Sequence, residues 1–137
     1  MSIWNNPDWK SDSPELDAEH KKLNQMLASM TAVIMKDSGL GLDTEAIDIL
    51  VERMRLHFRL EEASAESVDT DSCAILREDH ARLVTLLGQV RTSMIQGNRS
   101  EAQQQLKTFT TELQKHDAEI DIPLFRMMAK TKAALSN

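Results

Sequence analysis

The spacing of apolar residues is the feature of this sequence that most constrains its fold. Along four long segments they recur every three or four positions, which puts them on one face of a helix. The segments cover about residues 14–37, 44–65, 72–96 and 101–121, and a shorter one covers about 124–134. No segment alternates apolar and polar residues as a half-buried strand does. The sequence therefore predicts an all-α fold, an antiparallel up-down-up-down four-helix bundle with an N-terminal arm and a short C-terminal helix.

Cap and turn residues agree with these boundaries. Pro14 suits the first position of a helix, and Gly39 suits the left-handed residue that ends one. Ser100 and Gln103 have the spacing of a capping box at the start of the fourth helix. Gly88 lies inside the third helix, where glycine weakens a helix by up to about 1 kcal/mol relative to alanine. We therefore expect another backbone to approach this helix closely at Gly88.

The length of 137 residues predicts a single domain, residues 1–137, in which an N-terminal arm of residues 1–12 precedes the bundle. The arm holds both tryptophans, Trp4 and Trp9, in a polar stretch without helical periodicity. Because each indole ring is a large apolar surface, we expect the arm to dock on the bundle. Residues 66–71 are mostly polar and predict the loop between the second and third helices.

Composition excludes several classes of partner. The formal charge is -6 without a basic patch, so we expect no binding to nucleic acid or to an anionic membrane surface. Arg53, Arg55 and Arg59 are expected on solvated helix faces without a function. No apolar run reaches the roughly 18 residues of a spanning helix, and the N-terminus has no signal-peptide pattern, so we expect a cytoplasmic protein. The single cysteine, Cys73, excludes an intrachain disulfide and a cysteine-based zinc site. No feature of the sequence indicates an oligomeric state.

Histidines interrupt the apolar faces. His20, His57, His80 and His116 are the only histidines, and each lies on the apolar face of a different helix. Glu61 follows His57 by four residues, so an imidazole and a carboxylate share one face about a turn apart. Burying such groups without partners costs several kcal/mol. A single histidine of this kind is more often a hydrogen-bonded core residue, but four of them together with acids favour a metal site. Imidazole and carboxylate ligands without thiolate favour iron, with manganese or zinc as alternatives.

Asp121 is the second acid predicted to join this site. It follows His116 by five residues, which is about 140° of rotation on a straight α-helix, so the two side chains would not share a face. Pro123 removes a backbone hydrogen bond, and we expect the helix to loosen or end there and to turn Asp121 inward. Four imidazoles and two carboxylates that can each bridge are too many ligands for one tetrahedral zinc, and they suit two metal ions. The ferritin-like di-iron bundles need two Glu-x-x-His motifs, which this sequence lacks.

Several of these residues belong to a pattern that extends along nearly the whole chain. Its pieces are the tryptophan-containing arm, Leu16-Asp17-Ala18-Glu19-His20-Lys21-Lys22-Leu23, His57-Phe58-x-x-Glu61-Glu62, the helix with His80, and His116-x-x-x-x-Asp121. In this pattern the chain resembles the bacterial hemerythrin family. The resemblance implies an antiparallel four-helix bundle around two non-haem irons, which are bridged by an oxo or hydroxo group and by Glu61 and Asp121. It also implies one iron on His20 and His57, with an open position for dioxygen, and the other iron on His80 and His116.

The sequence departs from the family pattern at Leu76. The family's third helix carries His-x-x-x-His, and here the earlier histidine is Leu76, with no fifth histidine to replace it. Cys73, Glu78 and Asp79 are not expected to substitute, because they lie a turn away or on other sides of a regular helix. The iron on this helix would therefore lack a protein ligand, and we expect it to bind weakly or to take water in the gap. A second open position would let small ligands or peroxide reach both metals. The alternative is that Leu76 marks a degenerate site.

The residues leave several functions open. The first is reversible binding of dioxygen at a ferrous pair for storage, delivery or sensing, so we expect an oxygen-binding protein rather than an enzyme. The second is redox catalysis on peroxide or nitric oxide at the under-ligated iron. The third is a degenerate mono-iron or metal-poor domain of the same family. A phosphotransfer domain is disfavoured because its histidine must be exposed to meet a kinase, and metal analysis would distinguish a metal-free scaffold.

Overall fold

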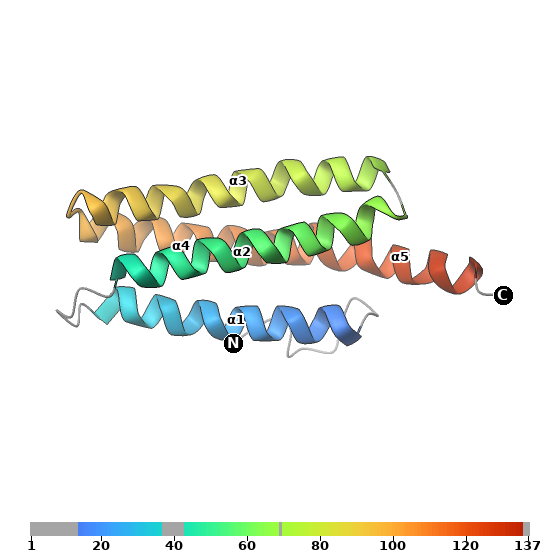
Figure 1. Ribbon diagram of the computed structural model, residues 1–137, viewed down its shortest axis with the longest axis horizontal. Coiled ribbons are helices and arrows are strands. Elements are labelled where there is room, and N and C mark those ends of the chain that lie inside the picture. Colours follow the sequence, from blue (N-terminus) through green and yellow to red (C-terminus); the bar gives the residue numbers. More distant parts are fainter. Residues whose placement is uncertain (1–13, 37–42, 69, 136–137) are drawn as a thin grey trace.

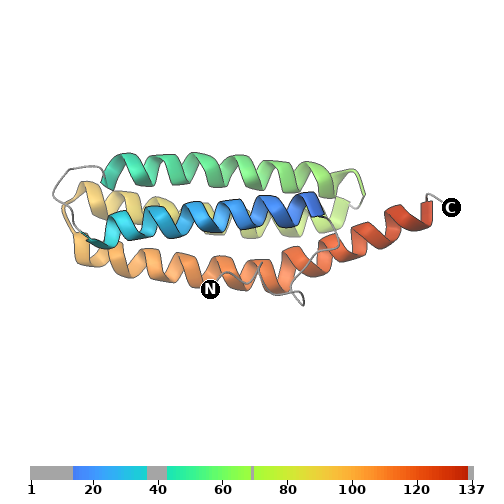
Figure 2. The same cartoon turned by 90° about the horizontal axis from the view of Figure 1, so that it is seen from below.

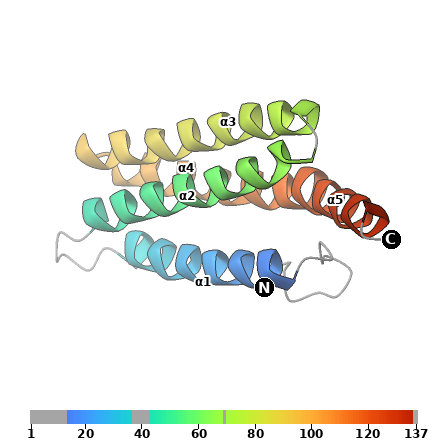
Figure 3. The same cartoon turned by 45° about the vertical axis from the view of Figure 1, so that its right-hand side comes forward.

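The computed structural model describes residues 14–36, 43–68 and 70–135, and within these ranges it is an all-α bundle (Figure 1). Its elements are α1 (Pro14–Lys36), α2 (Asp43–Glu66), α3 (Thr70–Ile95), α4 (Arg99–His116), the π-helical turn η3 (Asp117–Asp121) and α5 (Ile122–Leu135). Consecutive helices from α1 to α4 run in opposite directions (Figure 1). α2 packs on both α1 and α3, and it lies between them in the view of Figure 3. The predicted fold class, a four-helix bundle with a short C-terminal helix, is confirmed.

Some predicted boundaries differ from the structure. α2 continues to Glu66 and α3 begins at Thr70, so the connection is shorter than the loop predicted at 66–71. The polar residues there weaken a helix only slightly, and no glycine or proline is present to stop it. The segment predicted as a fourth helix at 101–121 begins at Arg99 and is α-helical only to His116. The predicted arm of residues 1–12 and the predicted stop at Gly39 lie outside the described residues.

Two local predictions are wrong. The side chain of Asn98, rather than Ser100, caps α4, because it accepts a hydrogen bond from the backbone N–H of Glu101 at 3.4 Å. Gln103 instead donates to the carbonyl of Met35 at the end of α1, at 3.3 Å. At Gly88, an added Cβ would meet no atom within 4 Å, so the expected close backbone approach does not occur among the described residues.

The buried side chains form two apolar clusters. The larger joins α1, α2, α3 and α4 and includes Leu50, Phe58 and Phe109. The smaller lies where α2, α3 and α5 meet, and it consists of Ala65, Cys73, Leu76, Phe125 and Met128. No described helix is long and apolar enough to cross a membrane.

The chain is helical without interruption from Arg99 to Leu135, but η3 changes its path, and α5 extends past the ends of the other helices (Figure 2). In η3 the N–H of Ile122 bonds to the carbonyl of Asp117, five residues earlier, which is the wide π-helical hydrogen bond. Pro123 follows directly, and because it has no backbone N–H it cannot donate the α-helical hydrogen bond to the carbonyl four residues earlier. The helix therefore loosens where the sequence predicted it, without ending.

Candidate metal centre

The structure brings all six predicted ligands together between the two apolar clusters. Each of them is at most 2% exposed: His20, His57, Glu61, His80, His116 and Asp121. They form two groups whose ligand atoms lie within 4.8 Å of one another: His20, His57, Glu61 and Asp121, and Glu61, His80, His116 and Asp121. The two carboxylates belong to both groups. Each group could hold a metal ion.

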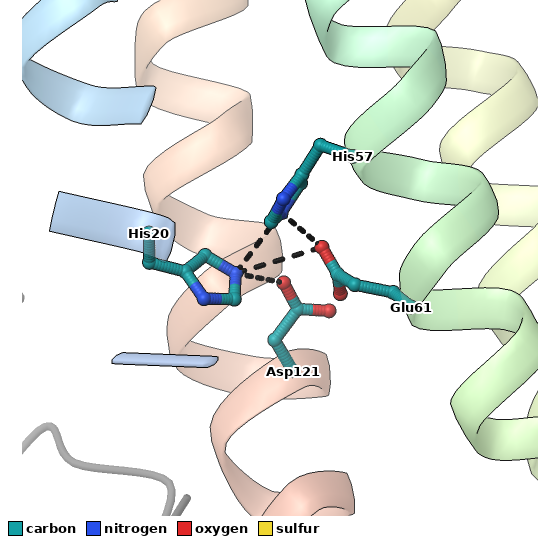
Figure 4. Close-up of side chains that lie close together, drawn as sticks. All are labelled: His20, His57, Glu61 and Asp121. Atoms are coloured by element: carbon teal, nitrogen blue, oxygen red, sulfur yellow. Dashed lines mark hydrogen bonds and ion pairs between the residues drawn. The ribbon is translucent and has the colours of Figure 1, made fainter. Parts of the chain in front are cut away.

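The first group joins α1, α2 and η3 (Figure 4). Nε2 of His20 lies 3.2 Å from Nε2 of His57, 3.2 Å from Oδ2 of Asp121 and 3.5 Å from Oε1 of Glu61. Nε2 of His57 contacts the same Oε1 of Glu61. Two imidazole nitrogens and two carboxylate oxygens thus converge on one small space.

The second group uses the other oxygen of each carboxylate. Nε2 of His116 lies 2.8 Å from Oδ1 of Asp121, and Nε2 of His80 lies 3.9 Å from Oε2 of Glu61. The imidazole rings of His80 and His116 are 4.9 Å apart between their centroids. Glu61 and Asp121 therefore each direct one oxygen to either group, which is the arrangement that a carboxylate bridge between two metal ions requires.

The π-helical turn explains how Asp121 reaches this position. On a regular α-helix Asp121 would point about 140° away from His116. The wider turn of η3 reduces this rotation, and both side chains are buried and directed at each other. The inward position of Asp121 is therefore confirmed. Such turns inside α-helices occur frequently at functional sites.

In three of the four histidines a hydrogen bond from the second ring nitrogen fixes the orientation of the imidazole. Nδ1 of His20 donates to the carbonyl of Leu16 at 2.9 Å. Nδ1 of His80 donates to Oε2 of Glu62 at 2.8 Å. With Nδ1 acting as the donor, the lone pair of Nε2 faces the centre of the site, as metal ligation demands.

The Nδ1 atoms of the other two histidines each face a carboxylate, but only one of them donates a hydrogen bond to it. Nδ1 of His116 donates to Oδ2 of Asp79 at 2.5 Å. Nδ1 of His57 lies 3.8 Å from Oε1 of Glu19, beyond hydrogen-bond distance. We call Glu19, Glu62 and Asp79 the outer carboxylates.

The buried polar atoms fit a metal ion. Both oxygens of Glu61, Oδ1 of Asp121, and Nε2 of His80 and of His116 have no well-aligned hydrogen bond among the described residues, and their close contacts are ion pairs within the two groups. Buried polar atoms normally have such a bond, and leaving one unmade costs about 1–3 kcal/mol. All of these atoms face the same interior space, where metal ions would satisfy them together.

The same atoms form a dense ionic cluster in the metal-free protein. Burial disfavours the charged form of Glu61, but His57 and His20 hold the pKa of its carboxyl well below the usual range. Burial also opposes protonation of His20, yet the hydrogen bonds to Asp121 and Glu61 raise its pKa to about 11. Protons on the imidazoles thus neutralise the two carboxylates, and metal ions would have to displace them.

The hemerythrin HHE cation binding domain model matches residues 12–128. The chain belongs to this hemerythrin family. It matched no curated protein and no solved structure. Family membership and the two buried groups agree on metal binding by the core of the bundle.

The outer carboxylates of this hemerythrin were not predicted as site residues. Each lies next to a candidate ligand in the sequence but contacts the histidine of the following helix: Glu19 faces His57, Glu62 faces His80, and Asp79 faces His116. A neighbouring residue lies about 100° around the helix, so it points toward the adjacent helix rather than the core. The available signal was an acid directly beside three of the ligands, His20, Glu61 and His80.

Asp117 is a further buried acid that the sequence did not single out. It is 3% exposed and follows His116 directly. Burial and the nearby charge of Asp121 raise the pKa of its carboxyl well above the usual range.

Leu76 offers no ligand to the second group. Its side chain is fully buried in the smaller apolar cluster, against Phe125 and Met128. Cys73 in the same cluster donates its thiol to the carbonyl of Glu62 at 3.4 Å and does not join either group. Among the described residues, no additional histidine, cysteine, aspartate or glutamate completes the second group.

Proposed function

We propose that this hemerythrin binds two non-haem irons and uses them to bind dioxygen for storage, delivery or sensing. In this proposal Glu61 and Asp121 bridge the irons together with an oxo or hydroxo group. The single observation that carries it is the division of each carboxylate's oxygens between the two groups. One ion or a structural core would not need two shared carboxylates. Ferrous irons, when bound, would supply the electrons for reversible dioxygen binding.

The protein's own residues would orient the ligands and exclude water. Among the described residues, His20 and His57 alone accompany the two bridges in the first group, so an iron there would keep a coordination position for a small ligand. The apolar clusters on both sides of the site, with Phe58 stacked on His80 at 4.0 Å between ring centroids, keep the interior dry. Dioxygen is itself apolar, so such surroundings admit it and slow the entry of ions.

The absence of a donor at Leu76 favours a second candidate function. The iron on His80 and His116 would have an additional open position, and peroxide or nitric oxide could react there in the presence of a reductant. The same missing donor would, in its strongest effect, leave a chain that binds one iron or little metal. The predicted cytoplasmic location and the lack of nucleic-acid binding remain predictions.

Anaerobic loading with ferrous iron tests the proposal. We expect about two irons per chain and a visible absorption band that appears when dioxygen is admitted and disappears under argon. A chain that binds iron but shows no reversible band would refute the carrier function. Consumption of peroxide or nitric oxide over many turnovers with a reductant would instead support the enzyme.

A further inference from the structure

The outer carboxylates do not serve the two groups equally. In the second group, which lacks a donor at Leu76, Glu62 accepts from His80 at 2.8 Å and Asp79 accepts from His116 at 2.5 Å. Both imidazoles of this group therefore carry a short hydrogen bond to a charged acceptor. Hydrogen bonds to ionised groups are about twice as strong as neutral ones.

The first group has weaker support behind its imidazoles. His20 donates to a neutral backbone carbonyl, that of Leu16. His57 lies 3.8 Å from Glu19, whose carboxylate is bound by Arg53 instead. Charged hydrogen bonds are thus concentrated on the group that has lost a ligand.

Arginines hold the two close carboxylates in place. Nε of Arg77 donates to Oε1 of Glu62 at 3.3 Å, and Nε of Arg82 donates to Oδ1 of Asp79 at 2.9 Å. In each case the other oxygen of the carboxylate faces the histidine. Although partial burial opposes it, Arg82 and His116 lower the pKa of the Asp79 carboxyl.

We propose that Glu62 and Asp79 are positioning residues that strengthen His80 and His116 as metal ligands and so offset the ligand missing at Leu76. A carboxylate behind Nδ1 fixes the ring and raises the electron-donating strength of Nε2 toward a metal ion. The inference rests on the proposed two-metal site, but it concerns metal retention rather than dioxygen. Losing such a partner typically costs about 10- to 100-fold in metal affinity.

Anaerobic titration of the full chain with ferrous iron tests this inference. The variants are Glu62→Gln and Asp79→Asn, which keep the shape and remove the charge. We expect each to lower the affinity for the second iron by about 10- to 100-fold while the first binds as in the wild type. The free energy of unfolding of the metal-free variants separates the two roles, because a merely structural role would lower it and a positioning role would change the affinity for iron instead. Glu112→Gln is the matched control, because Glu112 contacts Arg82 at 3.0 Å but is not a hydrogen-bond partner of the histidines.

Several outcomes would overturn the inference. One is a second iron that binds equally well in Glu62→Gln, Asp79→Asn and the wild type. Another is a wild-type chain that holds only one iron, since nothing would then offset Leu76. Equal loss in Glu112→Gln would indicate a general effect of surface charge. A one-iron wild type would overturn the proposed two-iron function as well. The comparisons of the variants with the wild type and with Glu112→Gln overturn this inference alone, because they leave the iron content and the dioxygen response of the wild type unchanged.

A second inference comes from the outer face of α2. Ile49, Leu56 and Leu60 are 51%, 49% and 54% exposed, and their spacing of seven and four residues puts them on one side of the helix. Ile49 and Leu56, together with Met26 of α1, line a groove of about 610 Å³. Contiguous exposed apolar side chains of this kind mark interaction surfaces.

Charges along this face favour a second copy of the chain as the occupant. Glu52 lies toward the N-terminal half of the apolar row and Arg59 toward its C-terminal half, on the same flank. When two copies of a helix pack antiparallel about a twofold axis, identical flanks face each other with their ends exchanged. An axis near Leu56 then opposes Glu52 of each copy to Arg59 of the other. Glu52 also lies 3.6 Å from Arg55 of its own helix, an exposed contact that exchanges easily.

We infer that α2 forms a twofold contact with α2 of a second copy, with Leu56 at its centre. Sedimentation equilibrium of the full chain should show a concentration-dependent dimer. Glu52→Arg and Arg59→Glu should each raise its dissociation constant by about tenfold, because symmetry doubles every repulsive pair. The double variant, which combines Glu52→Arg with Arg59→Glu, should restore the dissociation constant of the wild type.

The control for this experiment is Ile75→Asp, which changes an apolar side chain of similar exposure, 60%, on a different helix, α3. It should leave the dissociation constant unchanged, whereas Leu56→Asp should abolish the dimer. A wild-type chain that is monomeric at all concentrations, as when another segment of the chain covers this face, would overturn the inference. A double variant that dimerises no more tightly than the single variants would also overturn the inference.

Discussion

Replacing Leu76 by histidine should destabilise the metal-free protein and increase its stabilisation by iron. Leu76 is fully buried against Phe125 and Met128. Burial of a leucine side chain contributes about 1.5–3 kcal/mol, and an unpaired imidazole in the same place costs about 1–3 kcal/mol more. We therefore expect the free energy of unfolding of the metal-free Leu76→His variant to fall by about 2.5–6 kcal/mol. Iron would give the new imidazole a partner and recover part of this loss.

Urea unfolding, followed by circular dichroism with and without ferrous iron in the absence of air, measures both effects. The matched control is Leu87→His, which introduces the same side chain at another fully buried position of α3, about two turns beyond His80. We expect iron to stabilise Leu76→His more than the wild type and Leu87→His no more than the wild type. Equal stabilisation of all three proteins would refute the argument that position 76 belongs to the metal site.

Three further predictions concern the metal-free protein. Despite burial, the contact with Asp121 raises the pKa of His116 to about 9, compared with about 6.5 in the unfolded chain. Its contribution to the free energy of unfolding is therefore complete below pH 6.5 and is lost as the pH rises through 9. Urea unfolding in the presence of a chelator should show this decline, and a free energy of unfolding independent of pH would contradict it. Gly88→Ala should raise the free energy of unfolding by up to about 1 kcal/mol, since an added Cβ meets no atom within 4 Å, and a loss would indicate crowding there. Phe109→Ala should lower the same quantity by about 3–5 kcal/mol, because Phe109 is fully buried in the larger cluster; a loss below 1 kcal/mol would show that the core collapses around the gap.

The helices and the candidate ligands other than Asp121 were predictable because both follow from one periodicity. Apolar residues at helical spacing identify the face that packs inward, and a histidine in that series must be buried with it. His20 and His80 are found where this argument puts them, each 1–2% exposed. The position of Asp121 was predictable only in part. The sequence indicated a distortion at Pro123, but not that a π-helical turn would begin six residues earlier.

Contacts between helices were the part that periodicity could not supply. Arg53 was expected on a solvated face, yet it binds Glu19 beside the site. Asp79 was expected to point away from the metals, and it does lie outside both groups, but it holds His116 from behind. Such contacts depend on how far each helix is rotated against its neighbour, which the pattern of a single helix does not specify. The expectation that another backbone approaches Gly88 closely was wrong for the same reason, because the space around Gly88 is set by the packing of the helices.

The wide turn at η3 amounts to one residue more than a regular helix would hold between α4 and α5. Deleting one residue there would restore regular α-helical hydrogen bonding, but it would rotate all that follows by about 100° relative to His116. Asp121 would leave the ligand groups or Phe125 would leave the apolar cluster around Leu76. The number of residues between His116 and Phe125 is therefore constrained as tightly as the chemical nature of the ligands.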